Sequence, residues 1–191
     1  MTKHDSHAEA LQRDFPAAPL VPALDFARRG IPSHGHSAVD FEQRVNFDRL
    51  REYRISRAVE SLEASGCGAF LLFDFYNIRY TTQTWIGGAL GDKMSRYALL
   101  TRDRKPYLWD FGSAAKHHKL FAPWLEPKRS MAGMLGLRGA IHPDVGLMRD
   151  AVTTIKGILT DAGVAEEPIG IDIVEPEFLC EMRRQGRKVV D

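Results

Sequence analysis

The chain has 191 residues, of which 26 are basic and 25 acidic, so its formal net charge at pH 7 is only +1. A charge this close to zero gives no general attraction to nucleic acid or to anionic lipid, and we expect neither as a partner. The hydrophobic content of 44% is ample for a real core. The apolar runs are too short to cross a bilayer and the N-terminus lacks a signal-peptide pattern, so we expect a cytoplasmic location by default.

The two cysteines, Cys67 and Cys180, lie far apart in the sequence and form no CxxC spacing. This usage gives no support for a disulfide framework or a structural zinc site. We therefore expect two buried free thiols.

Residues 1 to about 40 differ in composition from the rest, with four prolines, four histidines and no sustained period. The stretch predicts an N-terminal arm, extended or partly disordered. His34 and His36 alone do not indicate a metal site, since such sites need three or four converging ligands.

The pattern changes from Asp40, and an amphipathic helix of about four to five turns is predicted to end at Ser65, because apolar residues recur at helical spacing: Phe47, Leu50, Ile55, Ala58 and Leu62. The Ser65-Gly66 pair is a typical helix stop. The apolar run Ala69 to Phe73 follows at once and predicts a strand buried on both faces. Helix, glycine turn and buried strand together indicate an α/β unit.

The segment Asp74 to Asn77 is rich in turn-forming residues, and residues 78–82 could form a short helix or an extended piece. The loop from Trp85 to Asp92 has three glycines but not the spacing of a phosphate-binding loop. Tyr97 to Thr101 and Tyr107 to Phe111 are apolar and aromatic with five residues between them, which predicts a hairpin in the central sheet.

A helix is predicted from Ser113 to about Phe121, with a solvated basic face made by Lys116, His117, His118 and Lys119. Adjacent histidines project about 100° apart on a helix, so His117 and His118 do not form a metal-binding pair. The Gly- and Met-rich run Met131 to Gly139 indicates a flexible connector.

The C-terminal third predicts a helix begun by His142-Pro-Asp144 and closed at Asp161 to Gly163, a buried strand from Ile169 to Ile173, and a helix from Pro176 to Gln185. The last residues, Lys188 to Asp191, read as another strand. An inner strand at the very end of a chain is unusual for a single domain, so we expect a truncation at a domain boundary.

The order of the predicted elements and several short sequence motifs resemble the N-terminal domain of the creatinase, prolidase and Xaa-Pro aminopeptidase superfamily. The motifs are Gly68 to Asp74, Asn77-Ile-Arg-Tyr80, Arg96 to Leu100, Gly170-Ile-Asp172 and Val189-Val-Asp191. The similarity covers residues 41 to 191 and is greatest to the dimethylsulfoniopropionate lyase branch. It implies an α/β fold of three α/β/α layers with a mixed, ribonuclease-H-like central sheet.

The resemblance also implies that the chemistry lies elsewhere. In the superfamily a C-terminal pita-bread domain holds two divalent metal ions with two aspartates, a histidine and two glutamates, and manganese, zinc, iron or cobalt is expected there. That half is missing here. Asp74 and Asp172 each stand singly at strand positions, so the sequence assigns no metal ligand within this chain.

In creatinase-like dimers the N-terminal domain leans over the partner subunit's active site, so the resemblance implies a role in substrate contact. The candidates are Asn77, Arg79, Tyr80, Trp85, Asp92 and Arg96. Arg96 could pair with a substrate carboxylate or with Asp92. Trp85 could cap a cationic or apolar substrate, or pack at a dimer interface. Ser95 stands where creatinase carries an arginine, which argues against creatine itself.

The sequence contains no nucleophile constellation, so we predict no catalytic residue in this chain. The first hypothesis is a non-catalytic domain that supports dimerisation and substrate access in a metal-dependent hydrolase or lyase. A proline peptide, a creatine-like compound and a sulfonium zwitterion are all open as substrates. The alternative is a free-standing small-molecule binding or scaffold domain, and a nucleotide-binding enzyme is disfavoured.

Overall fold

The computed structural model describes residues 45–86, 95–133, 142–173 and 176–190. The predicted N-terminal arm, residues 1–40, and the candidate Asp92 lie outside these ranges. Within them, no helix has the length and apolar character needed to span a membrane.

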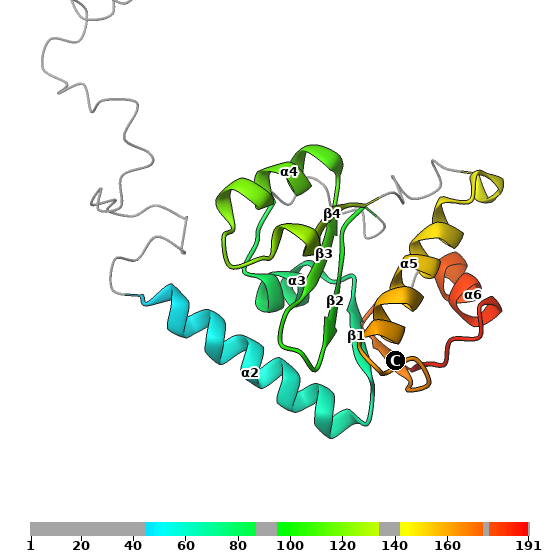
Figure 1. Cartoon of the computed structure of the whole chain (residues 1–191), viewed down its shortest axis with the longest axis horizontal. Helices are drawn as coiled ribbons and strands as arrows, with labels where there is room; N and C mark the ends of the chain where they lie inside the picture. The colour runs from blue at the N-terminus through cyan, green and yellow to red at the C-terminus, as the bar shows by residue number, and fades with distance from the viewer. Residues whose placement is uncertain (1–44, 87–94, 134–141, 174–175, 191) are drawn as a thin grey trace, which may run out of the picture. The chain divides into compact units, whose positions relative to one another are not determined.

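A single mixed sheet of six strands forms the centre of the fold, in the order β4-β3-β2-β1-β5-β6 (Figure 1). The strands are β1 (Ala69–Leu72), β2 (Tyr97–Thr101), β3 (Tyr107–Asp110), β4 (Ser130–Ala132), β5 (Ile169–Ile171) and β6 (Val189–Val190). β2 is antiparallel to both β1 and β3, whereas the pairs β1–β5, β5–β6 and β3–β4 are parallel. An antiparallel β1-β2-β3 unit extended by two strands parallel to β1 is the ribonuclease-H-like arrangement that we expected.

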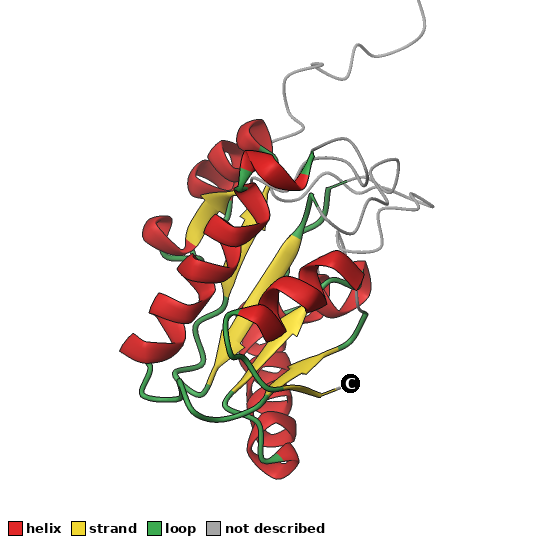
Figure 2. Ribbon diagram, turned by 90° about the vertical axis from the view of Figure 1, so that its right-hand side faces the viewer, coloured by secondary structure: helices red, strands yellow, loops and turns green. Residues whose placement is uncertain are grey.

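Within the described ranges, five α-helices cover the two faces of this sheet (Figure 2). They are α2 (Phe47–Ser65), α3 (Phe75–Thr82), α4 (Gly112–Phe121), α5 (Leu147–Asp161) and α6 (Pro176–Arg184). Successive residues of a strand point to opposite faces. Leu71 accordingly packs with buried residues of α5 and α6, whereas Leu72 packs with Ile78 of α3 on the other face. The three-layer α/β/α prediction is confirmed.

The larger core lies on the α5 and α6 face. Its centre is an aromatic stack in which the Tyr97 ring lies 4.8 Å from that of Trp109 and 5.6 Å from that of Phe73. Phe178 of α6 meets Phe73 edge-on at 5.4 Å. Burying each such ring contributes about 1.5–3 kcal/mol, which makes this face the main source of stability.

Four local predictions are wrong. The turn-rich reading of residues 74–77 fails because Asp74 caps α3, accepting hydrogen bonds from the backbone N–H groups of Tyr76 and Asn77. The predicted connector contains β4, an edge strand of three residues that is too short to show a period. Cys180 is an exposed thiol, although Cys67 is buried as expected. His118 is buried rather than solvated, as described below.

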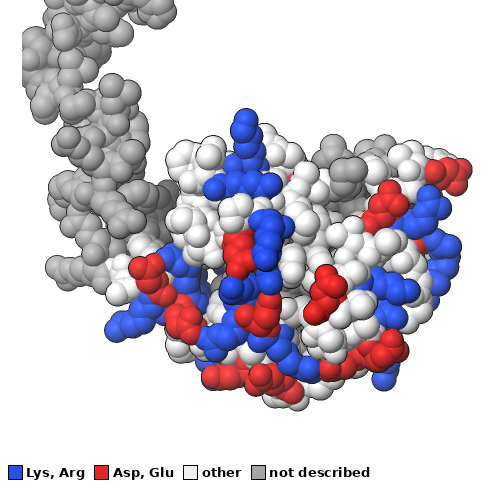
Figure 3. Space-filling view, in the orientation of Figure 1, with Lys and Arg blue, Asp and Glu red and all other residues white. Residues whose placement is uncertain are grey.

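Basic and acidic side chains intermingle on the face shown in Figure 3. The described residues form exposed ion pairs such as Arg104–Glu52 and Lys105–Glu126. The mixed surface on this face matches the near-zero net charge.

Candidate functional site

One edge of the sheet gathers most of the predicted site residues. β1, β3 and β5 all end at this edge, and β2 begins there because it runs antiparallel to β1 and β3. Ligand-binding groups of open α/β sheets usually lie just outside the carboxyl ends of strands. We call this region the carboxyl edge.

Asp172, which follows β5, is connected by hydrogen bonds to the end of β1 and to the first turn of α3. Its Oδ1 accepts a hydrogen bond from the backbone N–H of Phe73 at 2.8 Å, and its Oδ2 accepts from that of Asp74 at 3.1 Å. The Asn77 amide also donates to Oδ2, at 3.0 Å. Asn77 is therefore held as part of a structural tie between two neighbouring parallel strands.

An aromatic cluster stands beside this tie. The Trp85 ring meets Phe75 edge-on at 6.2 Å and lies 6.3 Å from the ring of Tyr76. The Arg79 guanidinium carbon lies 5.1 Å from the Trp85 ring centroid, within range of a cation–π contact. Tyr76 is 72% exposed and Trp85 is 44% exposed, so the cluster presents aromatic surface to solvent.

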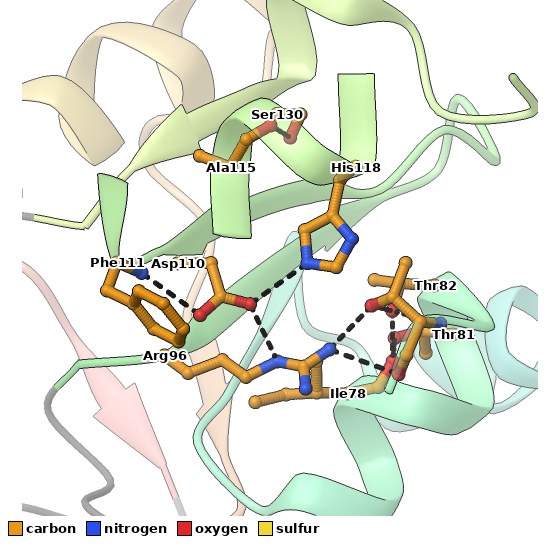
Figure 4. Close-up of polar contacts among 10 residues, drawn as sticks. Ile78, Thr81, Thr82, Arg96, Asp110, Phe111, Ala115, His118 and Ser130 are labelled. Atoms are coloured by element: carbon orange, nitrogen blue, oxygen red, sulfur yellow. Dashed lines mark hydrogen bonds and ion pairs between the residues drawn. The ribbon is translucent and has the colours of Figure 1, made fainter. Parts of the chain in front are cut away.

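Behind the aromatic cluster lies a buried polar network built on Asp110, the last residue of β3 (Figure 4). Asp110 Oδ2 lies 3.3 Å from Nε of Arg96 and 3.1 Å from Nε2 of His118 on α4. Each of these three side chains is at most 4% exposed. An ionised carboxylate can only accept, so His118 presents a protonated Nε2 to Asp110.

Arg96 carries the network onward to Thr84, the residue before Trp85. Its Nη2 donates to the Thr84 carbonyl at 3.0 Å and to Thr84 Oγ1 at 2.5 Å. Burial lowers the pKa of the Arg96 guanidinium and the charge of Asp110 opposes that shift, but an arginine stays protonated throughout. Nε and Nη1 of Arg96 make no hydrogen bond of acceptable geometry, so the ion pair with Asp110 is its main charge compensation.

The structure brings only some of the predicted candidates together. Arg79 contacts the Trp85 ring. Arg96 bonds Thr84, the residue before Trp85, but the Arg96 guanidinium is paired with Asp110. Tyr80 lies against α2, with the Arg54 guanidinium carbon 5.6 Å from its ring. Whether any of these residues contacts a substrate stays a prediction.

Sequence reasoning missed Asp110 and His118. A signal for His118 was present, because Ala114, Ala115, His118 and Ala122 follow a helical spacing of small residues and are all buried. We read the helix by its charged residues and so placed His118 on the solvated face. Asp110 gave no local signal, since an acid at a strand end is common in turns.

The described residues contain no group of three or more His, Cys, Asp or Glu side chains that could hold a metal ion. The two aspartates considered from the sequence are both engaged with the backbone. Asp74 caps α3, and both oxygens of Asp172 accept N–H groups. The arrangement therefore does not fit a binuclear metal centre, and no chemical step through a metal is derived for these residues.

The fold and this edge define a class: an α/β domain with a ribonuclease-H-like sheet whose carboxyl edge carries an exposed aromatic cluster over a buried charge network. No protein-family model matches the sequence. No characterised protein matches it at a significant level.

The solved structures to which this chain is similar include peptidases and a creatinase/prolidase-like domain. An Xaa-Pro aminopeptidase structure from Streptococcus pyogenes is 15% identical, with a TM-score of 0.49 over 75% of this chain and 92% of that one. The creatinase/prolidase-like N-terminal domain of a Corynebacterium diphtheriae protein is 12% identical, with a TM-score of 0.49 and coverages of 74% and 94%.

An Xaa-Pro dipeptidase from Bacillus anthracis is 10% identical with a TM-score of 0.49, and the match covers 73% of this chain but 33% of that one. This chain thus spans about a third of the dipeptidase's length. These three comparisons concern the backbone structure and give no information about a substrate. The finer resemblance to the dimethylsulfoniopropionate lyase branch stays a prediction.

Proposed function

We propose that this chain is the non-catalytic N-terminal domain of a larger metal-dependent enzyme, a hydrolase or lyase of the creatinase and Xaa-Pro peptidase type. Its task is to support dimerisation and to shape the entrance through which substrate reaches the metal centre. One observation carries the proposal. The motif Asn77 to Tyr80, on which the resemblance depends, forms α3 at the carboxyl edge, and its Arg79 packs on the exposed Trp85 ring.

The partners in this proposal are the chain's own C-terminal catalytic domain and a second subunit of a homodimer. The divalent metal, manganese, zinc, iron or cobalt, belongs to the catalytic domain. The substrate is a short peptide or another small molecule, and the setting is the cytoplasm.

Trp85 and Arg79 are the residues best supported as substrate contacts. The tryptophan offers partly exposed ring surface, and the Arg79 guanidinium packs over that ring. Arg96 is too deeply buried for direct contact in this conformation, so its contribution is to hold Thr84 and hence Trp85.

The test uses the polypeptide encoded by the complete reading frame, loaded with manganese and assayed against Xaa-Pro dipeptides, creatine and a dimethylsulfonium zwitterion. Trp85→Ala should raise KM for the accepted substrate by about fivefold or more, with little change in kcat, because a binding contact is lost. Tyr53→Ala is the control, since Tyr53 is an exposed aromatic residue of α2 outside this network.

Two results would overturn the proposal. One is a complete reading frame without the two aspartates, the histidine and the two glutamates of a pita-bread centre. The other is unchanged kinetics in Trp85→Ala. A strictly monomeric full-length enzyme would remove the dimerisation part.

A second candidate function is a free-standing small-molecule binding domain. It is favoured by a hollow of about 640 Å³ whose lining includes Ser61, Phe70, Leu72 and Gly170. Thermal stabilisation of this chain alone by an apolar ligand, abolished by Ser61→Leu at the wall of the hollow, would support it. The absence of any such ligand from a broad screen would count against it.

A further inference from the structure

Asp110, Arg96 and His118 join three consecutive elements of the fold. His118 belongs to α4, Asp110 ends β3, and Arg96 immediately precedes β2. The chain of contacts runs from His118 Nε2 to Asp110 Oδ2, from Asp110 Oδ2 to Arg96 Nε, and from Arg96 Nη2 to Thr84 (Figure 4). It ends one peptide bond from Trp85.

Because the contacts are buried, the position of the Arg96 guanidinium depends on that of the Asp110 carboxylate. A buried arginine that lost its acid would leave an uncompensated charge in a medium of low polarity, so its guanidinium must stay where the carboxylate lies. The Asp110 carboxylate is itself oriented by two further donors, the backbone N–H of Phe111 on Oδ1 at 3.0 Å and His118 on Oδ2. His118 therefore helps to decide the direction in which Arg96 points.

Arg96 reaches the aromatic cluster by a second route. Its guanidinium carbon lies 5.5 Å from the ring of Phe75, whose edge meets Trp85. The Thr84 end is also braced, because Thr84 Oγ1 lies 2.7 Å from Thr82 Oγ1 and the Thr82 hydroxyl bonds the Ile78 carbonyl. Two independent contacts thus connect the Arg96 guanidinium to the position of Trp85.

We propose that His118 and Asp110 are positioning residues for Trp85: His118 orients the Asp110 carboxylate, which holds the Arg96 guanidinium that places Thr84 and Trp85 at the carboxyl edge. The proposal rests on the proposed function only in treating Trp85 as part of a substrate entrance. The positioning itself is a property of this chain and is measured without substrate or catalytic domain.

The test replaces the three tryptophans with 5-fluorotryptophan and follows the fluorine NMR signals, with the Trp85 signal assigned by Trp85→Phe. Line broadening by a soluble paramagnetic probe reports how exposed each ring is. His118→Leu removes the donor to Asp110, whereas His118→Gln carries an amide nitrogen to the place of Nε2. His117→Leu is the matched control, because His117 is the exposed neighbour on the same helix.

We expect His118→Leu to shift the Trp85 signal and to change its broadening by roughly twofold, and His118→Gln to restore both toward the wild-type values. His117→Leu should leave them unchanged. Ile155→Val, which destabilises the core on the opposite face of the sheet, controls for general loosening. Should His118→Leu fail to fold, His118→Asn takes its place, since its amide is too short to reach Asp110.

An unmoved Trp85 signal in His118→Leu would overturn the proposal. So would an equal change in Ile155→Val, which would mean that Trp85 responds to stability rather than to the network. Neither result bears on whether Trp85 contacts a substrate, which the kinetics of Trp85→Ala decide separately.

Discussion

Arg96 and Asp110 form an ion pair in which Nε lies 3.3 Å from Oδ2 and neither side chain is more than 2% exposed. A pair so completely removed from water is costly to desolvate and is therefore most sensitive to the loss of one partner. The imidazole of His118 joins this pair through Asp110 Oδ2, and the group packs between the sheet and helices α3 and α4.

Asp110→Leu should lower the free energy of unfolding by about 3–5 kcal/mol, because it leaves the Arg96 charge buried beside Thr84 alone. Urea denaturation measures this loss. Glu60→Gln, which breaks the exposed pair with Arg57, should change stability by no more than about 0.5 kcal/mol. The double variant Arg96→Met with Asp110→Leu should be more stable than Asp110→Leu; a still less stable double variant would refute this account.

Tyr97 should make the protein sensitive to alkali. Burial raises the pKa of its phenol well above the usual range. A raised folded-state pKa contributes stability that is fully present below the unfolded value, about 10, and is lost as the pH rises above it. The unfolding free energy should therefore fall above about pH 10, and Tyr97→Phe should fall less steeply.

An ultraviolet titration of the phenols provides a second readout for the same residue. Of the five tyrosines in the chain, Tyr97 should ionise only when the protein unfolds. Ionisation of all five in the still-folded protein would contradict the prediction.

Gly68→Ala and Gly157→Ala should have opposite effects on stability. A Cβ at Gly68 would lie 2.8 Å from the Cβ atoms of both Val164 and Glu167, so overpacking should cost about 1–3 kcal/mol. A Cβ at Gly157, inside α5, meets nothing within 4 Å, and the alanine should add about 0.5–1 kcal/mol through its helix propensity. Thermal unfolding of the two variants side by side tests the pair; a stabilised Gly68→Ala would show the close approach to be unimportant.

Asp172→Ala should cost about 1–3 kcal/mol, because the carboxylate accepts hydrogen bonds from three backbone N–H groups and from the Asn77 amide. Asn77→Ala removes only one of these contacts and should cost less than about 1 kcal/mol. Chemical denaturation ranks the two. Equal losses would mean that the backbone contacts of Asp172 contribute little.

Much of the fold could be predicted because its signals are local. The continuous apolar run at residues 69–73 and the aromatic hairpin strands lie where the sequence placed them, and α5 buries the face that its spacing indicated. β4 was not predicted, because three residues on a sheet edge are too few to show an alternation of apolar and polar residues. A short helix over residues 78–82 was one of two predicted alternatives, but the first turn of α3 was not predicted, because its capping residue, Asp74, is also a common turn former.

The candidate site was predicted less completely. Trp85 and Arg79 were both chosen from the sequence, but their contact with each other was not foreseen. The sequence predicts that Arg96 pairs with a substrate carboxylate or, as a surface arginine, with Asp92, whereas the structure buries Arg96 and pairs it with Asp110. His118 lies on the alanine-rich face of α4, and this spacing was the only local feature of the sequence that indicated its burial.

The amino-acid sequence by itself determined where helices and strands form, because apolar periodicity, glycine stops and capping residues act within a few positions of the chain. Only the tertiary structure decided which polar groups meet inside. Arg96, Asp110 and His118 come together because β2 pairs with β3 in one register and α4, which follows β3, packs against it. Apolar spacing does not specify that meeting, since it is set by strand register, by helix packing and by the need of a buried charge for an opposite one.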